Sequence, residues 1–204
     1  MPGKSSKPWY NEMNLILGSS STPRKNVLKQ LKIPFKTISP DIDESIKDGE
    51  SPSKLTSRLS IEKAIAVKEK LKKPGVVIAG DQVLECNQKI FGKPLTKENA
   101  KKQLEFYSEK NACFFTSVCV FNTKNNHIQT VTCQTPLKFK KLNTNQIDKY
   151  LALETPYECA GSFRVEGLGV CLVETLVSSE PYAILGMPIL SITKMLQATG
   201  ITVI

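Results

Sequence analysis

The stretch Val76-Val77-Ile78-Ala79-Gly80-Asp81-Gln82-Val83-Leu84 decides the fold, and a Gly92-Lys93-Pro94 turn follows it closely. Its unbroken run of β-branched and aliphatic residues predicts a strand that is buried on both faces of a sheet. A carboxylate at the far end of such a strand must be satisfied by a partner, a metal or a ligand rather than by bulk water. Asp81 is therefore the first candidate for chemistry, and a strand-terminating role beside Gly80 is the alternative.

The composition limits the class of protein. The chain has 204 residues, 40% hydrophobic content and mixed charge, as is typical of one soluble globular domain. No apolar stretch approaches the roughly 20 residues that span a bilayer. Residues 1–12 are rich in Lys, Ser and Pro and lack the apolar core of a signal peptide. We therefore expect a disordered leader over residues 1–12, a single domain over residues 13–204 and a cytoplasmic location.

The scarcity of histidine narrows the chemistry. His127 is the single histidine, and it lies in a polar stretch that is typical of a hairpin turn. The six cysteines are scattered without a Cys-x-x-Cys pair, as expected of reduced cysteines that serve packing. We therefore expect neither histidine-based acid–base chemistry nor a zinc site nor a disulfide framework. Catalysis would have to use carboxylates, lysines and arginines, with or without a divalent cation.

The formal net charge of +9 indicates an anionic partner. Only three of the basic residues are arginines, and two of them, Arg24 and Arg164, fall in segments rich in glycine and serine. A nucleic-acid-binding surface would be richer in arginine and exposed aromatic residues. This distribution favours a phosphorylated small molecule over a nucleic acid.

A serine-rich loop follows the first expected strand, Met13 to Leu17. Ser21 or Thr22 can cap the next helix, with Pro23 at its first position. The helix N-terminus would then offer backbone N–H groups to an anion, and Arg24 in the first turn would add a guanidinium fork. A cation there opposes the helix dipole, so an anion that normally binds would explain Arg24. An ordinary capped helix with a solvated arginine is the alternative.

The remaining elements alternate between strands and helices. We expect strands or hairpins at residues 35–38, 84–91, 112–122 and 128–142, and helices at residues 51–71, 96–106, 143–153 and 189–198. This alternation, with one long antiparallel pair, predicts an α/β fold with a mixed sheet. Lys63 falls on the apolar side of its helix, where it either reaches the edge of the core or points into a polar cleft. The acidic stretch before Ser45 forms a solvated loop or supplies one metal ligand.

Short motifs follow one another in a fixed order: Leu17-Gly18-Ser19-Ser20-Ser21-x-x-Arg24, Asp43-Glu44, Glu62-Lys63-Ala64, Gly80-Asp81-Gln82-Val83, Gly92-Lys93-Pro94, Ala160-Gly161-Ser162-Phe163 and Gly186-Met187-Pro188. In this order they resemble the Maf family of nucleoside triphosphate pyrophosphatases. The resemblance implies a Maf- and ITPase-like α/β fold, with a mixed, elongated and twisted sheet flanked by helices and two lobes around a central cleft. It also implies metal-dependent hydrolysis of a nucleoside triphosphate to the monophosphate and pyrophosphate, with Mg²⁺ or Mn²⁺ as cofactor.

The resemblance also implies roles for individual residues. Asp81 would be the general base that activates water, and Glu44 and Asp81 would hold the cation. The residues that bind the substrate phosphates would be Ser19, Arg24, Lys63 and Lys93. Lysine, arginine and a divalent cation can neutralise a leaving pyrophosphate, so this set of residues suits the reaction.

Two segments resemble the branch of the family that acts on 7-methyl-GTP, namely Gly80-Asp81-Gln82-Val83 and Ser162-Phe163-Arg164-Val165-Glu166-Gly167. Gln82 and Glu166 would read the base, because guanine presents two donors that match a carboxylate acceptor and N7 methylation makes the ring cationic. The alternative for Glu166 is a solvated acid paired with Arg164. Two departures concern substrate choice. Pro23 stands where relatives often carry a large residue, and Lys25 stands where they commonly carry a second arginine.

Three functions stay open at this point. The first is house-cleaning hydrolysis of a modified nucleotide, above all 7-methyl-GTP, and the second is a Maf pyrophosphatase that prefers dTTP or UTP. The third is a noncatalytic regulator of cell division that binds nucleotides or nucleic acid. The joint presence of Asp81, Glu44, Lys63 and Lys93 argues against a purely binding role. We expect a nucleotide as partner, no nucleic acid and no membrane, and we leave a homodimer open.

Overall fold

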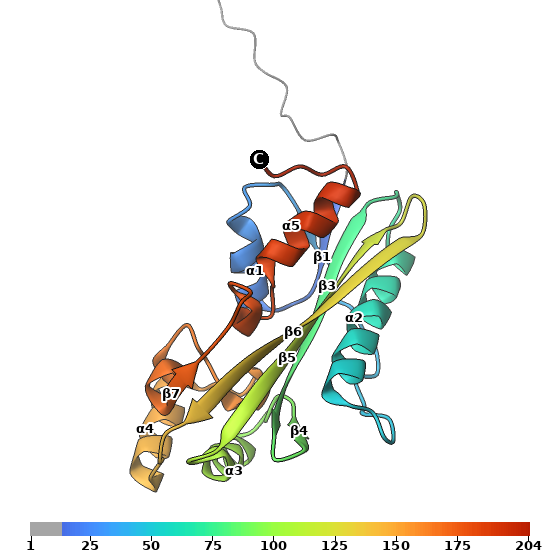
Figure 1. Ribbon diagram of the computed structural model, residues 1–204. Coiled ribbons are helices and arrows are strands. Elements are labelled where there is room, and N and C mark those ends of the chain that lie inside the picture. Colours follow the sequence, from blue (N-terminus) through green and yellow to red (C-terminus); the bar gives the residue numbers. More distant parts are fainter. Residues whose placement is uncertain (1–13) are drawn as a thin grey trace, which may run out of the picture.

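The computed structural model describes residues 14–204, so the predicted leader at residues 1–12 and the start of the first predicted strand lie outside the described part. Within residues 14–204, seven strands form one sheet in the order β2-β1-β3-β5-β6-β7, and β4 pairs with β3 as well. Five α-helices flank this sheet (Figure 1). The predicted α/β fold with a mixed sheet is confirmed.

Three long antiparallel strands form the body of the sheet (Figure 1), namely β3 (Val76–Cys86), β5 (Asn111–Asn122) and β6 (His127–Phe139). The short strands are β1 (Leu15–Gly18), β2 (Lys36–Thr37), β4 (Lys89–Phe91) and β7 (Val173–Leu176). β1 runs parallel to both β2 and β3, whereas the other pairs are antiparallel. The sheet is therefore mixed because β1 and β2 join the antiparallel body in parallel.

Side-chain caps set the start of most helices. Such caps precede α1 (Thr22–Lys29), α2 (Pro52–Glu69), α3 (Lys97–Tyr107) and α4 (Thr144–Glu154), whereas α5 (Ile189–Ala198) follows a proline. Of the two candidate caps before α1, the structure uses Ser21, whose Oγ accepts a hydrogen bond from the Arg24 N–H at 3.4 Å. The cap places Arg24 in the first turn of α1, as predicted.

Some strand boundaries differ from the prediction. The second strand was predicted at residues 35–38, but β2 contains only Lys36 and Thr37, which are both exposed. β6 ends at Phe139, before the predicted end at residue 142, because its register shifts between Lys138 and Phe139, where β7 pairs with it. β7 itself was not predicted. A four-residue strand that pairs with a distant segment leaves little local signal in the sequence.

Two apolar cores lie on the same face of the sheet, because alternate side chains of β3 point to that face. Ile78 packs in one core with residues of α1 and α5. Leu84 packs in the other with residues of α3 and α4. Between Ile78 and Leu84, the residues of β3 on this face are Gly80, which has no side chain, and Gln82, which lies opposite Thr116 of β5. A polar pair therefore separates the two cores.

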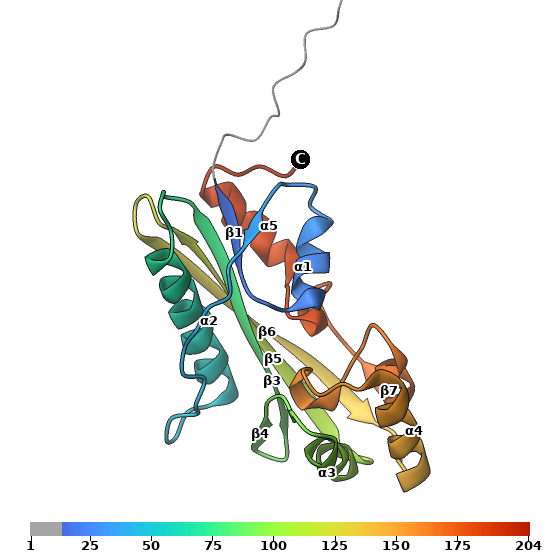
Figure 2. The same cartoon turned by 180° about the vertical axis from the view of Figure 1, so that it is seen from behind.

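The opposite face of the sheet is covered by α2 (Figure 2). Ala79 of β3 packs on one part of α2 and Val83 packs on another part. The residue between them on this face is Asp81, which lies opposite Ser117 of β5. Polar pairs therefore interrupt the apolar contacts at the same level on both faces. This level is the boundary between the two lobes, and the predicted chemistry lies here.

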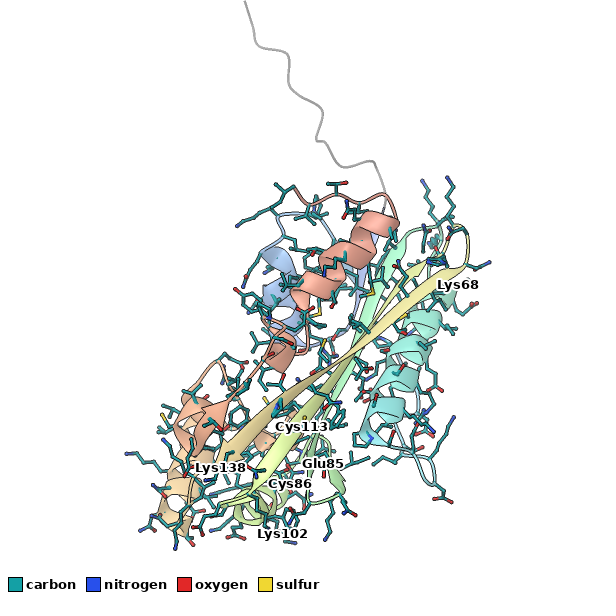
Figure 3. All side chains as sticks on the ribbon, in the orientation of Figure 1. Lys68, Glu85, Cys86, Lys102, Cys113 and Lys138 are labelled. Carbon is teal, nitrogen blue, oxygen red and sulfur yellow. The ribbon has the colours of Figure 1, made fainter. Side chains whose placement is uncertain are left out.

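Cys86 and Cys119 pack in the apolar cores, whereas Cys171 is exposed. Cys86 and Cys113 lie on neighbouring strands at one end of the sheet (Figure 3). Cys113 is paired with Glu85, so Cys86 points to the other face. Burial raises the pKa of the Cys86 and Cys113 thiols, which keeps them protonated and unreactive near neutral pH.

None of the helices in residues 14–204 has the length and apolar character needed to cross a membrane.

Candidate active site

The site forms where β3 has no neighbouring strand on one of its edges. β1 pairs with β3 only as far as Ala79, and β4 begins to pair at Leu84. No strand within residues 14–204 pairs with this edge between those two positions. Backbone groups that point to the open edge need other partners. The Gly80 carbonyl accepts a hydrogen bond from Arg24 Nη1 at 2.7 Å.

Arg24 reaches β3 from the first turn of α1. Its Nη1 also lies 3.5 Å from the Oγ of Ser19, which follows directly after β1. Burial lowers the pKa of Arg24 from its ordinary value, and the negative charges of Asp81 and Glu44 act in the opposite direction. An arginine stays protonated in proteins. The structure therefore places a half-buried guanidinium beside Ser19.

Lys63 lies at the centre of the charged residues. It comes from α2, and its side chain is only 7% exposed. Its Nζ lies 2.7 Å from Asp81 Oδ1 and 3.0 Å from Glu44 Oε1. A buried ammonium needs such partners to offset its loss of hydration. Of the two positions that the sequence allowed for Lys63, the structure selects the polar one.

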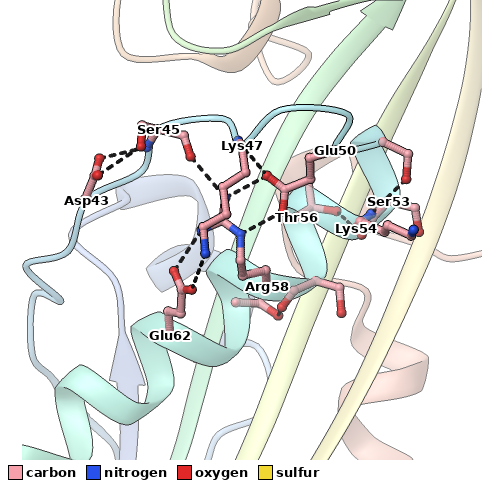
Figure 4. A network of polar contacts seen from close by, with 12 residues as sticks. Asp43, Ser45, Lys47, Glu50, Ser53, Lys54, Thr56, Arg58 and Glu62 are labelled. Atoms are coloured by element: carbon pink, nitrogen blue, oxygen red, sulfur yellow. Dashed lines mark hydrogen bonds and ion pairs between the residues drawn. The ribbon is translucent and has the colours of Figure 1, made fainter.

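Arg58 fastens the loop that carries Glu44 to α2 (Figure 4). Its guanidinium forms a fork on Glu50, with Nε to Oε1 and Nη2 to Oε2 both at 2.7 Å. Nη1 donates to Glu62 at 2.9 Å, and Nη2 donates to the Ser45 carbonyl at 3.0 Å. The hydrogen bonds from Arg58 lower the pKa of Glu50 to about 2. Because Ser45 adjoins Glu44, this network holds Glu44 beside the site.

Sequence reasoning gave Arg58 no role, although a signal was present. Arg58 is one of only three arginines in a lysine-rich chain, and a fork on a carboxylate is a geometry that arginine provides and lysine does not. The other two arginines lie in glycine- and serine-rich segments, and Arg58 lacks this signal. The partners of Arg58 depend on the path of the loop between Asp43 and Glu50, which no local pattern predicts.

Glu44 and Asp81 suit a divalent cation. Mg²⁺ is commonly bound by one or two carboxylates together with substrate phosphates and water. Lys63 occupies Oδ1 of Asp81, whereas Oδ2 has no hydrogen-bond donor among the described residues. Residues 14–204 contain no group of three or more His, Cys, Asp or Glu side chains that could hold a metal ion. Two carboxylates are therefore enough for a cation whose other ligands are phosphate oxygens and water.

Gln82 lies on the other face of the sheet from Asp81, because adjacent residues of a strand alternate. Its Nε2 lies 2.8 Å from Thr116 Oγ1, and 3.1 Å from each of the carbonyls of Ala183 and Ile184. The Thr116 hydroxyl donates its own hydrogen to Ala183 at 3.0 Å. All three neighbours are thus acceptors, so Nε2 must face them and Oε1 must point away. Gln82 is therefore an oriented side chain, and its Oε1 accepts no hydrogen bond from residues 14–204.

Lys93 lies with the late glycine loop. The N–H of Gly161 donates to the carbonyl of Gly92 at 3.0 Å, which joins this loop to the Gly-Lys-Pro turn. Lys93 itself is exposed and lies 3.3 Å from Glu158. The structure therefore does not bring Lys93 into contact with Lys63 or the other predicted phosphate ligands.

Glu166 lies near the surface of the same loop. Its Oε1 is 3.8 Å from Arg164 Nε, and Arg164 Nη1 is 3.2 Å from Glu154. The pairing with Arg164 that the sequence left as an alternative is thus present. Burial raises the pKa of the Cys159 thiol to about 11, and the charges of Glu166, Arg164 and Lys93 also act on it. These charges therefore gather around one position in the late loop.

The predicted residues fall into three places. Ser19 with Arg24, and Lys63 with Asp81 and Glu44, adjoin each other through Gly80 and Asp81 of β3. Glu166 belongs to the late loop, and Lys93 belongs to the Gly-Lys-Pro turn that is bonded to this loop. Gln82 lies between the two lobes. Pro23 is half-buried at the start of α1 beside Arg24.

Comparisons with known proteins agree with the motifs. Residues 14–199 match the sequence model of Maf, described as Maf-like protein. The chain is 40% identical over 190 residues to a 7-methyl-GTP pyrophosphatase of Pseudoalteromonas translucida (strain TAC 125), covering 93% of this chain and 94% of that one. It is also 40% identical over 190 residues to a 7-methyl-GTP pyrophosphatase of Vibrio parahaemolyticus serotype O3:K6 (strain RIMD 2210633), covering 93% and 97%.

Among solved structures, the Staphylococcus aureus Ham1 protein is similar with a TM-score of 0.44 and 16% identity, covering 76% of this chain and 89% of that one. A HAM1 protein from Coxiella burnetii is similar with a TM-score of 0.43 and 14% identity, covering 78% and 98%. The family assignment rests on the sequence model and on the identity over nearly the whole chain. The protein belongs to the Maf family.

Proposed function

We propose that this protein hydrolyses a nucleoside triphosphate between the α- and β-phosphates and that its preferred substrate is 7-methyl-GTP. The observation that carries the proposal is the contact of Lys63 with both Asp81 and Glu44, beside Arg24, in a chain of the Maf family. The printed names of the relatives at 40% identity support the same reaction and substrate. Such an enzyme would act on the nucleotide pool of the cytoplasm.

The triphosphate would bind at the open edge of β3. Arg24 and Ser19 would donate to phosphate oxygens at the start of α1, where the helix N-terminus also favours an anion. Lys63 would exchange its contact with Glu44 for a phosphate oxygen while keeping its contact with Asp81. The ammonium would then remain compensated on both sides. Lys93 would approach the phosphates from the turn beside the late loop.

Asp81 would act as the general base. Its Oδ1 is held by Lys63 at 2.7 Å, which orients the carboxylate and leaves Oδ2 to accept a proton from the attacking water. The water oxygen forms a bond to the α-phosphorus while the bond from that phosphorus to the bridging oxygen breaks. The bridging oxygen leaves with the electron pair as part of pyrophosphate. The products are the nucleoside monophosphate and pyrophosphate.

A divalent cation is part of the proposal, and Glu44 and Asp81 would hold it. When bound, such a cation neutralises negative charge on the triphosphate and on the leaving group. The two carboxylates leave most of its coordination sites to phosphate oxygens and water, which is the usual arrangement for Mg²⁺.

Gln82 and Glu166 would select the base. The free Oε1 of Gln82 is an acceptor, and so is the carboxylate of Glu166, whereas the Watson–Crick edge of guanine presents two donors. The positive charge of a ring methylated at N7 would also favour the anionic Glu166. Uracil and thymine offer only one donor on the equivalent edge, so the same acceptors would match them less well. This difference favours 7-methyl-GTP over UTP and dTTP.

The test is pyrophosphate release from a panel of nucleotides that contains 7-methyl-GTP, GTP, UTP and dTTP, each with Mg²⁺, Mn²⁺ or EDTA. We expect the highest kcat/KM for 7-methyl-GTP and no release in EDTA. A higher kcat/KM for UTP or dTTP would refute 7-methyl-GTP as the preferred substrate and would still support the proposed reaction. Release from none of the nucleotides under any condition would refute the reaction and favour the noncatalytic alternative.

A further inference from the structure

Gly186 lies against the side chain of Arg24. It follows the short 3-10 helix η3 (Ala183–Leu185) and has φ +78. A Cβ added to Gly186 would lie 2.7 Å from Arg24 Nε and 3.3 Å from Arg24 Nη2, and real Cβ atoms essentially never come within 3.0 Å. Either Gly186 or the Arg24 side chain would have to shift to relieve this contact. A shift of the Arg24 side chain would displace the guanidinium, whose Nη1 donates to the Gly80 carbonyl at 2.7 Å.

The same turn contacts β3 at two further points. A Cβ added to Gly80 would lie 3.5 Å from the Gly186 carbonyl, so the two backbones pass close to each other. The carbonyls of Ala183 and Ile184 accept the hydrogen bonds from Gln82. The segment from Ala183 to Gly186 thus lies against β3, and Ala183 is 101 positions after Gln82 in the sequence.

We propose that Gly186 is a positioning residue for Arg24. The space left by its missing side chain is where the guanidinium turns onto the Gly80 carbonyl, and this contact fixes how the other N–H groups of Arg24 are presented to a phosphate. The inference rests on the proposed function only for the assignment of Arg24 to the substrate phosphates. Gly186 touches no reacting atom and acts through Arg24.

The primary test is Gly186→Ala. Kinetics of pyrophosphate release should show kcat/KM reduced by about 10- to 100-fold, as expected when one charged hydrogen-bond donor is misplaced. Gly200→Ala is the matched control, because Gly200 also has positive φ (+89) but is exposed just after α5. Both variants strain a left-handed backbone, but of the two glycines Gly186 lies against Arg24. Gly200→Ala should therefore reduce kcat/KM by less than about 2-fold.

A double-mutant cycle separates the contact with Arg24 from backbone strain. In an Arg24→Ala background, where the guanidinium is absent, Gly186→Ala should reduce kcat/KM by less than about 3-fold. An equal reduction in both backgrounds would show that Gly186 acts through strain alone. Activity of Gly186→Ala equal to that of the unchanged protein would also overturn the proposal. Gly186→Asn carries the same Cβ with less strain, so it should match Gly186→Ala and remains usable if the alanine variant fails to fold.

A crystal structure of Gly186→Ala or Gly186→Asn tests the same contact without any assay of activity. The proposal predicts that Arg24 Nη1 no longer lies within hydrogen-bond distance of the Gly80 carbonyl. A retained bond would overturn it. If the unchanged protein releases pyrophosphate from no nucleotide, the proposed function fails, and the crystallographic result still decides the positioning role.

Discussion

Single side chains decide the chemistry of this site. Lys63 compensates two carboxylates at once, at 2.7 Å from Asp81 and 3.0 Å from Glu44. Asp81 is almost fully buried and Glu44 is half exposed, so the two carboxylates depend on Lys63 to different extents. Removing the ammonium would leave Asp81 buried without its cation, which is a costly arrangement.

We expect Lys63→Ala to reduce kcat/KM for pyrophosphate release by at least about 100-fold, because it removes the proposed phosphate ligand and the group that orients the proposed base, Asp81. Lys72→Ala is the control, since Lys72 is an exposed lysine just after α2. The two variants should be compared in steady-state kinetics. Equal, modest losses in both would instead indicate that the chain attracts its substrate through diffuse positive charge.

The proposed base selection can also be tested at single residues. We expect Glu166→Gln to lower the ratio of kcat/KM for 7-methyl-GTP to that for UTP. The decrease should correspond to a free-energy difference of about 1.5 to 3 kcal/mol, which is the contribution of one hydrogen bond to a charged group. Glu174→Gln is the control, because Glu174 is also an exposed acid in an ion pair, with Lys138 at 2.7 Å. A ratio left unchanged by Glu166→Gln would show that the base is read elsewhere.

Whole elements hold these side chains in place, and the sequence predicts elements better than the contacts between them. The three long strands and the four capped helices follow local patterns, namely apolar runs and Ser, Thr or Asn caps. The opposite directions of Asp81 and Gln82 follow from the two-residue period of a strand. By contrast, the bond from Arg24 to Gly80 joins residues 56 positions apart, and only the completed fold brings them together.

The loop between Asp43 and Glu50 gives a pH-dependent prediction at this scale. Arg58 lowers the pKa of Glu50 to about 2 in the folded protein. In the unfolded chain, the pKa of a glutamate is about 4.3. The ion pair therefore stabilises the fold fully above about pH 4.5, and this contribution is lost as the pH falls toward 2. Urea unfolding should show a difference between the unchanged protein and Glu50→Gln that is constant near neutral pH and shrinks below about pH 4.5. A difference that stays constant down to pH 3 would contradict the account.

The molecule as a whole consists of two lobes with a polar layer between them. One apolar core lies with α1 and α5, another lies with α3 and α4, and the polar pairs on β3 and β5 separate them. The sequence indicated the site through the order of its motifs rather than through any single spacing. It could not show that the late loop gathers Lys93 and Glu166 apart from Lys63, because that arrangement depends on non-local contacts.

A ligand that bridges the two lobes should stabilise both. With a non-hydrolysable α,β-methylene analogue of 7-methyl-GTP at about 100 times its Kd, binding adds about 2.7 kcal/mol to the free energy of unfolding. For a domain of this size, that corresponds to a rise in Tm of about 5 to 10 °C. Differential scanning fluorimetry with Mg²⁺ should show one cooperative transition at the higher temperature. Two separated transitions, of which only one shifts, would contradict binding between the lobes.

The most direct test of the central claim is pyrophosphate release from 7-methyl-GTP by Asp81→Asn, which keeps the shape of the side chain and removes its charge and its capacity to accept a proton. Asp148→Asn is the matched control, because Asp148 also pairs with a lysine, Lys101 at 2.8 Å, but lies on α4. We predict that kcat falls by about 10² to 10⁴ in Asp81→Asn with the circular dichroism spectrum unchanged, and that Asp148→Asn keeps its activity. Turnover of Asp81→Asn close to that of the unchanged protein would contradict the account.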